Sequence, residues 1–164
     1  MRIGFDARFV DDRYHYDVPE TAARLGLRDR LLERGHVPDE DLAALYCGAM
    51  CMAIVSLYEG FGMPALEALA CGAPLIVSDR GSLPEIASGE AIVLNPWDVQ
   101  SIAHGLERIV GNEALRASLR QRGSRVASQF TWTAAAQATR RAPEQAYRPD
   151  AGRRARYPSP SVPR

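Results

Sequence analysis

The sequence is poor in the features that place a protein in a membrane or outside the cell. No apolar run reaches the roughly 18 residues that a membrane-spanning helix requires, and the first residues, MRIGFDARFVDD, lack the apolar segment of a secretory signal peptide. The three cysteines, Cys47, Cys51 and Cys71, form no Cys-x-x-Cys pair, and two thiols that share a helix face are too few for a zinc site. We expect buried free thiols in a reduced compartment, and therefore a cytoplasmic protein.

The sequence also lacks an excess of charge. Its 20 basic and 20 acidic residues cancel to a formal net charge of +0, which gives no reason to expect a nucleic-acid surface or a polybasic membrane contact. His15, His36 and His104 are scattered, and the acidic run at 39–41 is typical of a helix N-terminus, so neither indicates a metal site. The 164 residues are 46% apolar, which is enough for one domain with a buried core.

Apolar runs and helical patterns alternate through the middle of the chain. Three apolar runs rich in β-branched residues are typical of strands buried on both faces: CMAIVSLY at 51–58, PLIVSD at 74–79 and EAIVL at 90–94. Two weaker strand patterns precede them, RIGF at 2–5 and RLLER at 30–34. Capping residues and one-sided apolar stripes predict helices over 17–26, 38–49, 64–71 and 98–110, and a last helical region over 115–130 that bends near Gly123.

This order of elements predicts an α/β fold. Strands that alternate with helices at short spacing are joined by right-handed crossovers into a parallel sheet, here a partial doubly wound, Rossmann-like sheet. Ligands of such sheets bind beyond the carboxyl ends of the strands. The glycine-rich turn at 59–63 follows the apolar run at 51–58, so we expect it at that end of the sheet.

One stretch carries most of the chemistry. In YEGFGMPALEALACG, residues 58–72, Glu59 and Glu67 flank a turn that contains Gly60, Gly62 and Pro64. A glycine-rich turn that enters a helix leaves backbone N–H groups free at the helix start, where the dipole favours an anionic or hydroxyl-rich ligand. Ionised carboxylates only accept hydrogen bonds, so the glutamates suit the vicinal hydroxyls of a sugar. Two solvated surface glutamates explain the pattern equally well, and the residues alone leave both interpretations open.

A longer stretch carries a family resemblance. SLYEGFGMPALEALACGAPLIVSDRGSLPEI, residues 56–86, resembles the donor-binding signature of retaining GT-B glycosyltransferases, the group related to glycogen and sucrose synthases. That signature is a pair of glutamates eight positions apart, a helix end of small residues, an apolar strand and a Gly-Gly-x-x-Glu-like loop. Here the loop is GSLPE at 81–85, with serine at the second glycine position. The likeness continues through GHVPDEDLAALY upstream and through LNPWDVQSIAHGLERIV and FTWTAAA downstream, and covers roughly residues 17–140.

The resemblance implies a role for each residue of the glycine-rich turn. Glu67 would accept hydrogen bonds from the ribose hydroxyls of a nucleotide sugar, and Glu59, at the catalytic position, would contact hydroxyls of the donor sugar. The backbone of the turn would face the sugar and the diphosphate. The residues concerned are Phe61, Gly62, Met63 and Pro64.

Four other residues have weaker claims. Arg80 and Ser82 follow a strand end and are candidates for contact with the diphosphate. A solvated surface arginine is the better explanation of Arg80, and a capping box with Glu85 explains Ser82 equally well. We expect Trp97 and Trp132 to pack within the protein rather than stack on sugar. The family type that the stretch resembles usually needs no metal and no cofactor besides the donor.

The resemblance covers only part of a GT-B protein. Residues 1–16 resemble the first strand and loop of the N-terminal acceptor domain, and residues 17–142 resemble the nucleotide-sugar-binding domain, the second domain of the fold. Residues 143–164 are rich in proline and lack apolar periodicity, so we expect them to be disordered. The first strands of the donor domain are missing, which leaves an open sheet edge that favours self-association unless residues 2–5 fold back to cover it.

The function that the resemblance implies is transfer of a sugar from a nucleoside diphosphate sugar to a sugar or lipid-linked acceptor, with retention of the anomeric configuration. The missing strands usually bring an arginine and lysine pair that neutralises the leaving diphosphate, which is worth several kcal/mol, so we expect weak or no turnover from this chain alone. Two alternatives stay open. One is a non-catalytic remnant that still binds nucleotide sugars, and the other is an unrelated flavodoxin-like module that meets the motif by chance.

Overall fold

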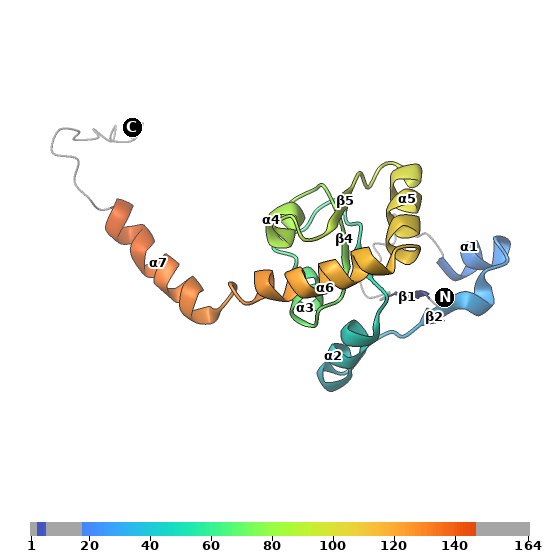
Figure 1. Cartoon of the computed structure of the whole chain (residues 1–164), viewed down its shortest axis with the longest axis horizontal. Helices are drawn as coiled ribbons and strands as arrows, with labels where there is room; N and C mark the ends of the chain where they lie inside the picture. Colours follow the sequence, from blue (N-terminus) through green and yellow to red (C-terminus); the bar gives the residue numbers. More distant parts are fainter. Residues whose placement is uncertain (1–2, 6–17, 147–164) are drawn as a thin grey trace, which may run out of the picture.

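The structure, a computed structural model, describes residues 3–5 and 18–146 (Figure 1). Within these ranges it contains two parallel sheets, with strand orders β1-β2 and β3-β4-β5, so the α/β class with parallel strands is confirmed. The strands are β1 (Ile3–Phe5), β2 (Leu31–Glu33), β3 (Met52–Ile54), β4 (Leu75–Ser78) and β5 (Ile92–Leu94). The helices are α1 (Val18–Arg24), the 3-10 turn η2 (Arg28–Arg30), α2 (Asp39–Gly48), α3 (Met63–Ala70), α4 (Leu83–Ala87), α5 (Val99–Val110), α6 (Glu113–Ala127) and α7 (Trp132–Ala146).

The core is built on β4, the middle strand of the three-stranded sheet, which is buried along its whole length. Successive side chains of a strand point to opposite faces. Leu75 and Val77 pack on one face in a cluster that includes residues of α2, α3 and α4, while Ile76 packs on the other with residues of β5, α5 and α6. Helices therefore cover both faces, as the doubly wound pattern predicts.

The strand predicted at 51–58 is wrong in its length and its burial. β3 ends at Ile54, and Leu57 and Tyr58 are 50% and 81% exposed. Among the described residues, β3 pairs only with β4, so it lies at the edge of its sheet. Ala53, the middle residue of β3, is exposed. A strand with a neighbour on one side has less protein to bury it, and here the chain leaves the sheet early and enters the glycine-rich turn.

α6 crosses the sheet as one continuous helix, in place of the predicted bend at Gly123 (Figure 1). Gly123 is buried against α3, and a Cβ on it would lie 2.8 Å from Cδ2 of Leu69. The glycine thus lets the two helices approach closely. On the same helix, Arg120 donates to the carbonyl oxygens of Ala49 (2.8 Å) and Gly72 (3.2 Å), which follow the C-termini of α2 and α3.

The N-terminal strand is paired, but not where the sequence suggested. Ile3 lies opposite Leu31 and Phe5 opposite Glu33, so β1 adds to β2 and not to an edge of the three-stranded sheet. In the described ranges the outer side of β3 has no strand partner. Residues 6–17, which include the first residue of the helix predicted over 17–26, lie outside the described residues.

The C-terminal helix α7 extends away from the helices that cover the sheet (Figure 1). It continues to Ala146, so the predicted start of a disordered tail at 143 is too early, while residues 147–164 lie outside the described residues. Its side chains from Trp132 to Arg141 are exposed, and six of these residues line an open hollow of about 610 Å³. None of the helices in the described ranges is both long enough and apolar enough to cross a bilayer.

The cysteines are free, as expected, but none is fully buried. Cys47 is exposed, and Cys51 and Cys71 are half-buried. Burial still raises the pKa of the Cys51 and Cys71 thiols, and the neighbouring Cys47 adds to the rise at Cys71. The three thiols therefore border the core without filling it.

Candidate functional site

The site is built around a tight turn between β3 and α3, residues 59–62, here called the glycine loop. Gly62 has φ +91°, a left-handed conformation that other residues rarely adopt, and a Cβ on it would lie 3.0 Å from Cδ2 of Leu83. α3 then begins at Met63, with Pro64 in its first turn. Gly60 has open space around it, so packing within the chain does not require glycine at this position.

A second loop, after β4, fastens the glycine loop from the side. Gly81 has φ +57°, and a Cβ on it would lie 2.6 Å from the carbonyl oxygen of Glu59. The hydroxyl of Ser82 lies 2.7 Å from the carbonyl oxygen of Phe61 and 3.2 Å from that of Glu59. Its single proton is therefore donated to the backbone of the glycine loop. The predicted capping box with Glu85 is wrong, because the Ser82 side chain makes no cap hydrogen bond to α4.

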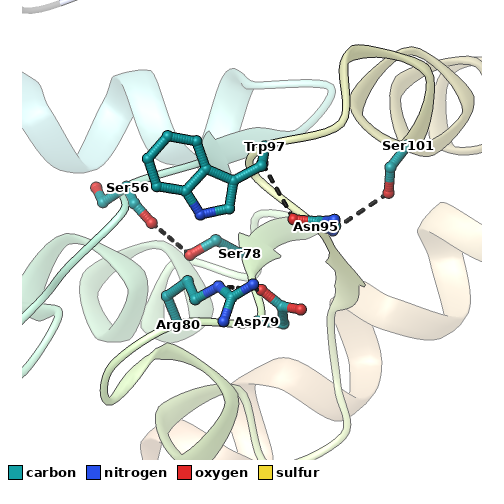
Figure 2. A network of polar contacts seen from close by, with 7 residues as sticks. All are labelled: Ser56, Ser78, Asp79, Arg80, Asn95, Trp97 and Ser101. Atoms are coloured by element: carbon teal, nitrogen blue, oxygen red, sulfur yellow. Dashed lines mark hydrogen bonds and ion pairs between the residues drawn. The ribbon is translucent and has the colours of Figure 1, made fainter.

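Glu59 is half-buried, and two successive hydrogen bonds, from Ser78 to Ser56 and from Ser56 to Glu59, hold its carboxylate. Ser78, the last residue of β4 and fully buried, donates to the carbonyl oxygen of Ser56 at 2.6 Å (Figure 2). Ser56 in turn donates from its hydroxyl to Oε1 of Glu59 at 2.9 Å. The carboxylate is therefore positioned from the carboxyl end of the central strand, where ligands of parallel sheets bind.

Glu67 is half-buried on α3 and held by a different element. The phenol of Tyr46, on α2, donates to its Oε2 at 3.2 Å. Tyr46 is only 8% exposed, and this burial, followed by the negative charge of Glu67, raises the pKa of the phenol to about 12. The sequence analysis singled out Glu67 but did not identify Tyr46 as its partner. The available signal was the phenolic hydroxyl itself, which needs a partner when it is buried.

Backbone donors complete the arrangement. In the described part of the chain, the N–H groups of Gly60, Phe61, Gly62 and Met63 have no protein acceptor. Free N–H groups at the start of a helix favour an anion, and the α3 dipole adds to their effect. The glycine loop thus presents backbone donors, while two carboxylates present acceptors: Glu59, the first residue of the loop, and Glu67 in α3.

Comparison with known proteins identifies the family. Residues 11–126 match the family model described as "Glycosyl transferases group 1". The chain belongs to this family. The alternative of an unrelated flavodoxin-like module is therefore wrong.

Relatives and solved structures agree with this assignment to the group 1 family. O-antigen chain mannosyltransferase B of Escherichia coli is 41% identical over 98 residues, which are 60% of this chain and 26% of that protein. MMP alpha-(1->4)-mannosyltransferase of Mycolicibacterium hassiacum is 38% identical over 121 residues, 71% of this chain and 29% of that protein. The chain thus spans between a quarter and a third of these relatives' length.

The fold likeness extends to enzymes with the GT-B architecture. Sucrose-phosphate synthase from Thermosynechococcus elongatus superposes with a TM-score of 0.70 at 28% identity, covering 79% of this chain and 33% of that one. The Anabaena HepE protein, solved in complex with UDP-glucose, has a TM-score of 0.73 at 23% identity, covering 87% of this chain and 39% of that one.

Two further candidate residues, Arg80 and Phe61, each contact a neighbouring side chain in the structure. Arg80 follows β4 and is exposed, as expected, and its Nε lies 3.0 Å from Oδ1 of the neighbouring Asp79 (Figure 2). The rings of Phe61, in the glycine loop, and Phe130 form a T-shaped pair with centroids 6.4 Å apart. The segment between α6 and α7 therefore contacts the glycine loop.

The prediction that the tryptophans pack within the protein is wrong. Trp97 is 69% exposed and Trp132 is 91% exposed. Trp97 lies in the turn after β5, where its backbone N–H donates to Oδ1 of Asn95 at 3.1 Å. This hydrogen bond holds the backbone while the exposed ring faces outward. Figure 2 shows the indole at the same end of the sheet as Ser78 and Arg80. Among the described residues, no group of three or more His, Cys, Asp or Glu side chains is placed to hold a metal ion.

Proposed function

We propose that this chain forms the nucleotide-sugar site of a retaining glycosyltransferase. The observation that carries the proposal is the glycine loop: it exposes N–H donors at the start of α3 and is held by Gly81 and Ser82, and it has one carboxylate at its first residue, Glu59, and another in α3, Glu67. Donors of this kind suit a diphosphate, and charged acceptors suit sugar hydroxyls.

Each group has a proposed task. Glu67 accepts hydrogen bonds from the ribose hydroxyls, Glu59 accepts from hydroxyls of the donor sugar, and the N–H groups of residues 60–63 face the diphosphate. Arg80, exposed at the carboxyl end of β4, contacts the leaving phosphate. In the reaction the bond from the anomeric carbon to the diphosphate oxygen breaks, and the acceptor oxygen, having lost its proton, bonds to the same face of that carbon.

The donor sugar proposed first for testing is mannose, because the most similar curated relatives include mannosyltransferases. GDP-mannose and UDP-glucose are therefore the donors to compare. We infer weak turnover or none from this chain alone, since positioning of an acceptor accounts for up to about 7–11 kcal/mol of a barrier and the chain spans only 26% of the first relative above. Binding of a donor without transfer fits this inference.

Three further properties belong to the proposal. Free thiols fit the reduced cytoplasm. The donor set of the site, N–H groups and an arginine, supplies the positive field for the diphosphate, so we propose that no metal is required. Among the described residues no strand pairs with the outer side of β3, so we propose weak self-association through this edge, measurable by sedimentation velocity across a range of concentrations.

The experiment is calorimetric titration of the chain and of Glu67→Gln with UDP, GDP and ADP. Removing the charge from the ribose acceptor is expected to cost about 1–3 kcal/mol, or roughly 5- to 150-fold in affinity. Glu107→Gln is the matched control, because Glu107 is exposed on α5. Equal affinity in the wild type and Glu67→Gln would overturn the role of Glu67, and no binding of any nucleotide would overturn the proposed function.

A further inference from the structure

The contact between Tyr46 and Glu67 joins a buried phenol to one oxygen of a carboxylate. The phenol hydroxyl donates to Oε2 at 3.2 Å. Tyr46 is 8% exposed and packs in the core cluster that also holds Ala65, Ala68 and Leu69 of α3. The ring is therefore locked by packing, and its hydroxyl reaches Glu67 from a fixed point.

The two helices that carry this contact are tied together at their ends. Arg120 donates from one guanidinium to the carbonyl oxygens of Ala49, after α2, and Gly72, after α3. Hydrogen bonds from a charged donor are among the stronger ones in proteins. The position of Tyr46 relative to Glu67 is thus fixed by the packing of its ring in the core and by the hydrogen bonds from Arg120 to the ends of α2 and α3.

A glutamate without such a partner has no fixed carboxylate plane. Its last torsion, between an sp³ and an sp² carbon, is broad, so the two oxygens rotate almost freely. A ligand that needs an oxygen in one place then has to pay the ordering entropy when it binds. A donor on Oε2 removes that freedom in advance and leaves Oε1 for another partner.

We propose that Tyr46 is a positioning residue: it holds Oε2 of Glu67 so that Oε1 faces the ribose hydroxyls of a nucleoside diphosphate. This inference rests on the proposed function, in which Glu67 contacts ribose. The phenol is suited to the task because its pKa of about 12 keeps it protonated, and hence a donor, throughout the neutral range.

The test compares Tyr46→Phe with the wild type in binding a ribonucleotide and its counterpart without ribose hydroxyls. UDP and 2′,3′-dideoxy-UDP are the first pair, with the guanosine pair run alongside. Tyr46→Phe keeps the ring in the core and removes only the hydroxyl. It is expected to weaken the ribonucleotide several-fold and leave the dideoxynucleotide unchanged, so the preference for ribose shrinks.

Controls separate this role from a structural one. Tyr58→Phe removes a hydroxyl from a ring that is 81% exposed, and it should leave the ribose preference as in the wild type. If Tyr46→Phe keeps the full ribose preference, or weakens both nucleotides equally, the positioning role is overturned. If the wild type itself binds both nucleotides equally, the ribose role of Glu67 fails instead, which is a different result. Thermal unfolding of each variant shows whether the fold is intact.

Discussion

Gly81 and Gly89 share a left-handed backbone but differ in their surroundings. Gly81 has φ +57° and would place a Cβ 2.6 Å from the Glu59 carbonyl oxygen, whereas Gly89 has φ +82° and open space around it. Gly89→Ala should therefore cost only the backbone strain, about 1–2 kcal/mol. Gly81→Ala should cost about 1–3 kcal/mol more, because the glycine loop has to move. Denaturant unfolding of both variants measures the difference, and equal losses would contradict the contact with Glu59.

Tyr46 makes a prediction about alkaline pH. The phenol loses its proton near its ordinary pKa of 10.0 in the unfolded chain but near 12 in the folded one. Between these values the unfolded chain binds fewer protons, so the free energy of unfolding should fall as pH rises from about 10 to 12, by on the order of 2–3 kcal/mol. The chain contains no lysine, and arginine stays protonated, so the other groups that titrate at alkaline pH are the five remaining tyrosines and the three cysteines.

The comparison that isolates Tyr46 is the same pH series on Tyr46→Phe. Thiols with raised pKa, those of Cys51 and Cys71, contribute in the same direction in both proteins and cancel in the difference. The variant should lose less stability than the wild type between pH 10 and 12. If the free energy of unfolding falls equally with pH in both proteins, the pKa of Tyr46 is not raised by its burial and the charge of Glu67.

Sequence reasoning succeeded for residues whose pattern is local. The glycine-rich turn and the helix after it were predicted from adjacent residues: Gly62 has a left-handed φ directly before α3, and Glu67 lies on that helix. The ligand roles of Glu59 and Glu67 stay predictions. Sequence reasoning failed for partners brought from elsewhere. Tyr46 comes from another helix to meet Glu67, and the hydroxyl of Ser82 turns back to the glycine loop, not to its own helix. Such contacts depend on how the helices pack, which periodicity does not specify.

Among the helices, α6 owes its position to charged contacts as well as to apolar ones. Arg120 joins it to the ends of α2 and α3 through two carbonyl oxygens. Arg120→Ala should cost about 2–3 kcal/mol in stability, since hydrogen bonds to a charged group contribute about 1.5–3 kcal/mol and the carbonyls would lose their partner. Arg125→Ala, at an exposed position on the same helix, should change stability by no more than about 0.5 kcal/mol. Thermal unfolding measures both, and similar values would show that the clamp is weak.

Elements were predictable where one pattern dominated. The run PLIVSD gave β4 because every residue of a central strand is buried, and Asp98 marked the start of α5, where it accepts from the N–H of Gln100. The run at 51–58 misled because an apolar stretch looks alike whether it lies in the centre of a sheet or at its edge. Residues 143–146 were assigned to a tail because the segment after 142 is rich in proline and lacks apolar periodicity, yet α7 continues to Ala146 and includes Pro143.

The chain spans between a quarter and a third of the length of the group 1 relatives described above. Its three-stranded sheet and the helices on both faces form the core, and the glycine loop lies beside the carboxyl end of β4, to which Gly81 and Ser82 fasten it. α7 extends from this core with exposed side chains and lines the hollow at Trp132–Arg141. The account assigns ligand binding to the glycine loop and none to that hollow.

Amide NMR of the isotopically labelled chain, titrated with GDP-mannose and with UDP-glucose, tests this assignment most directly. The account predicts that one of the two ligands shifts the amide signals of residues 60–63 and of α3 around Glu67, and that Glu67→Gln weakens the response. It would be contradicted if neither ligand moved these signals, or if the changes were confined to α7.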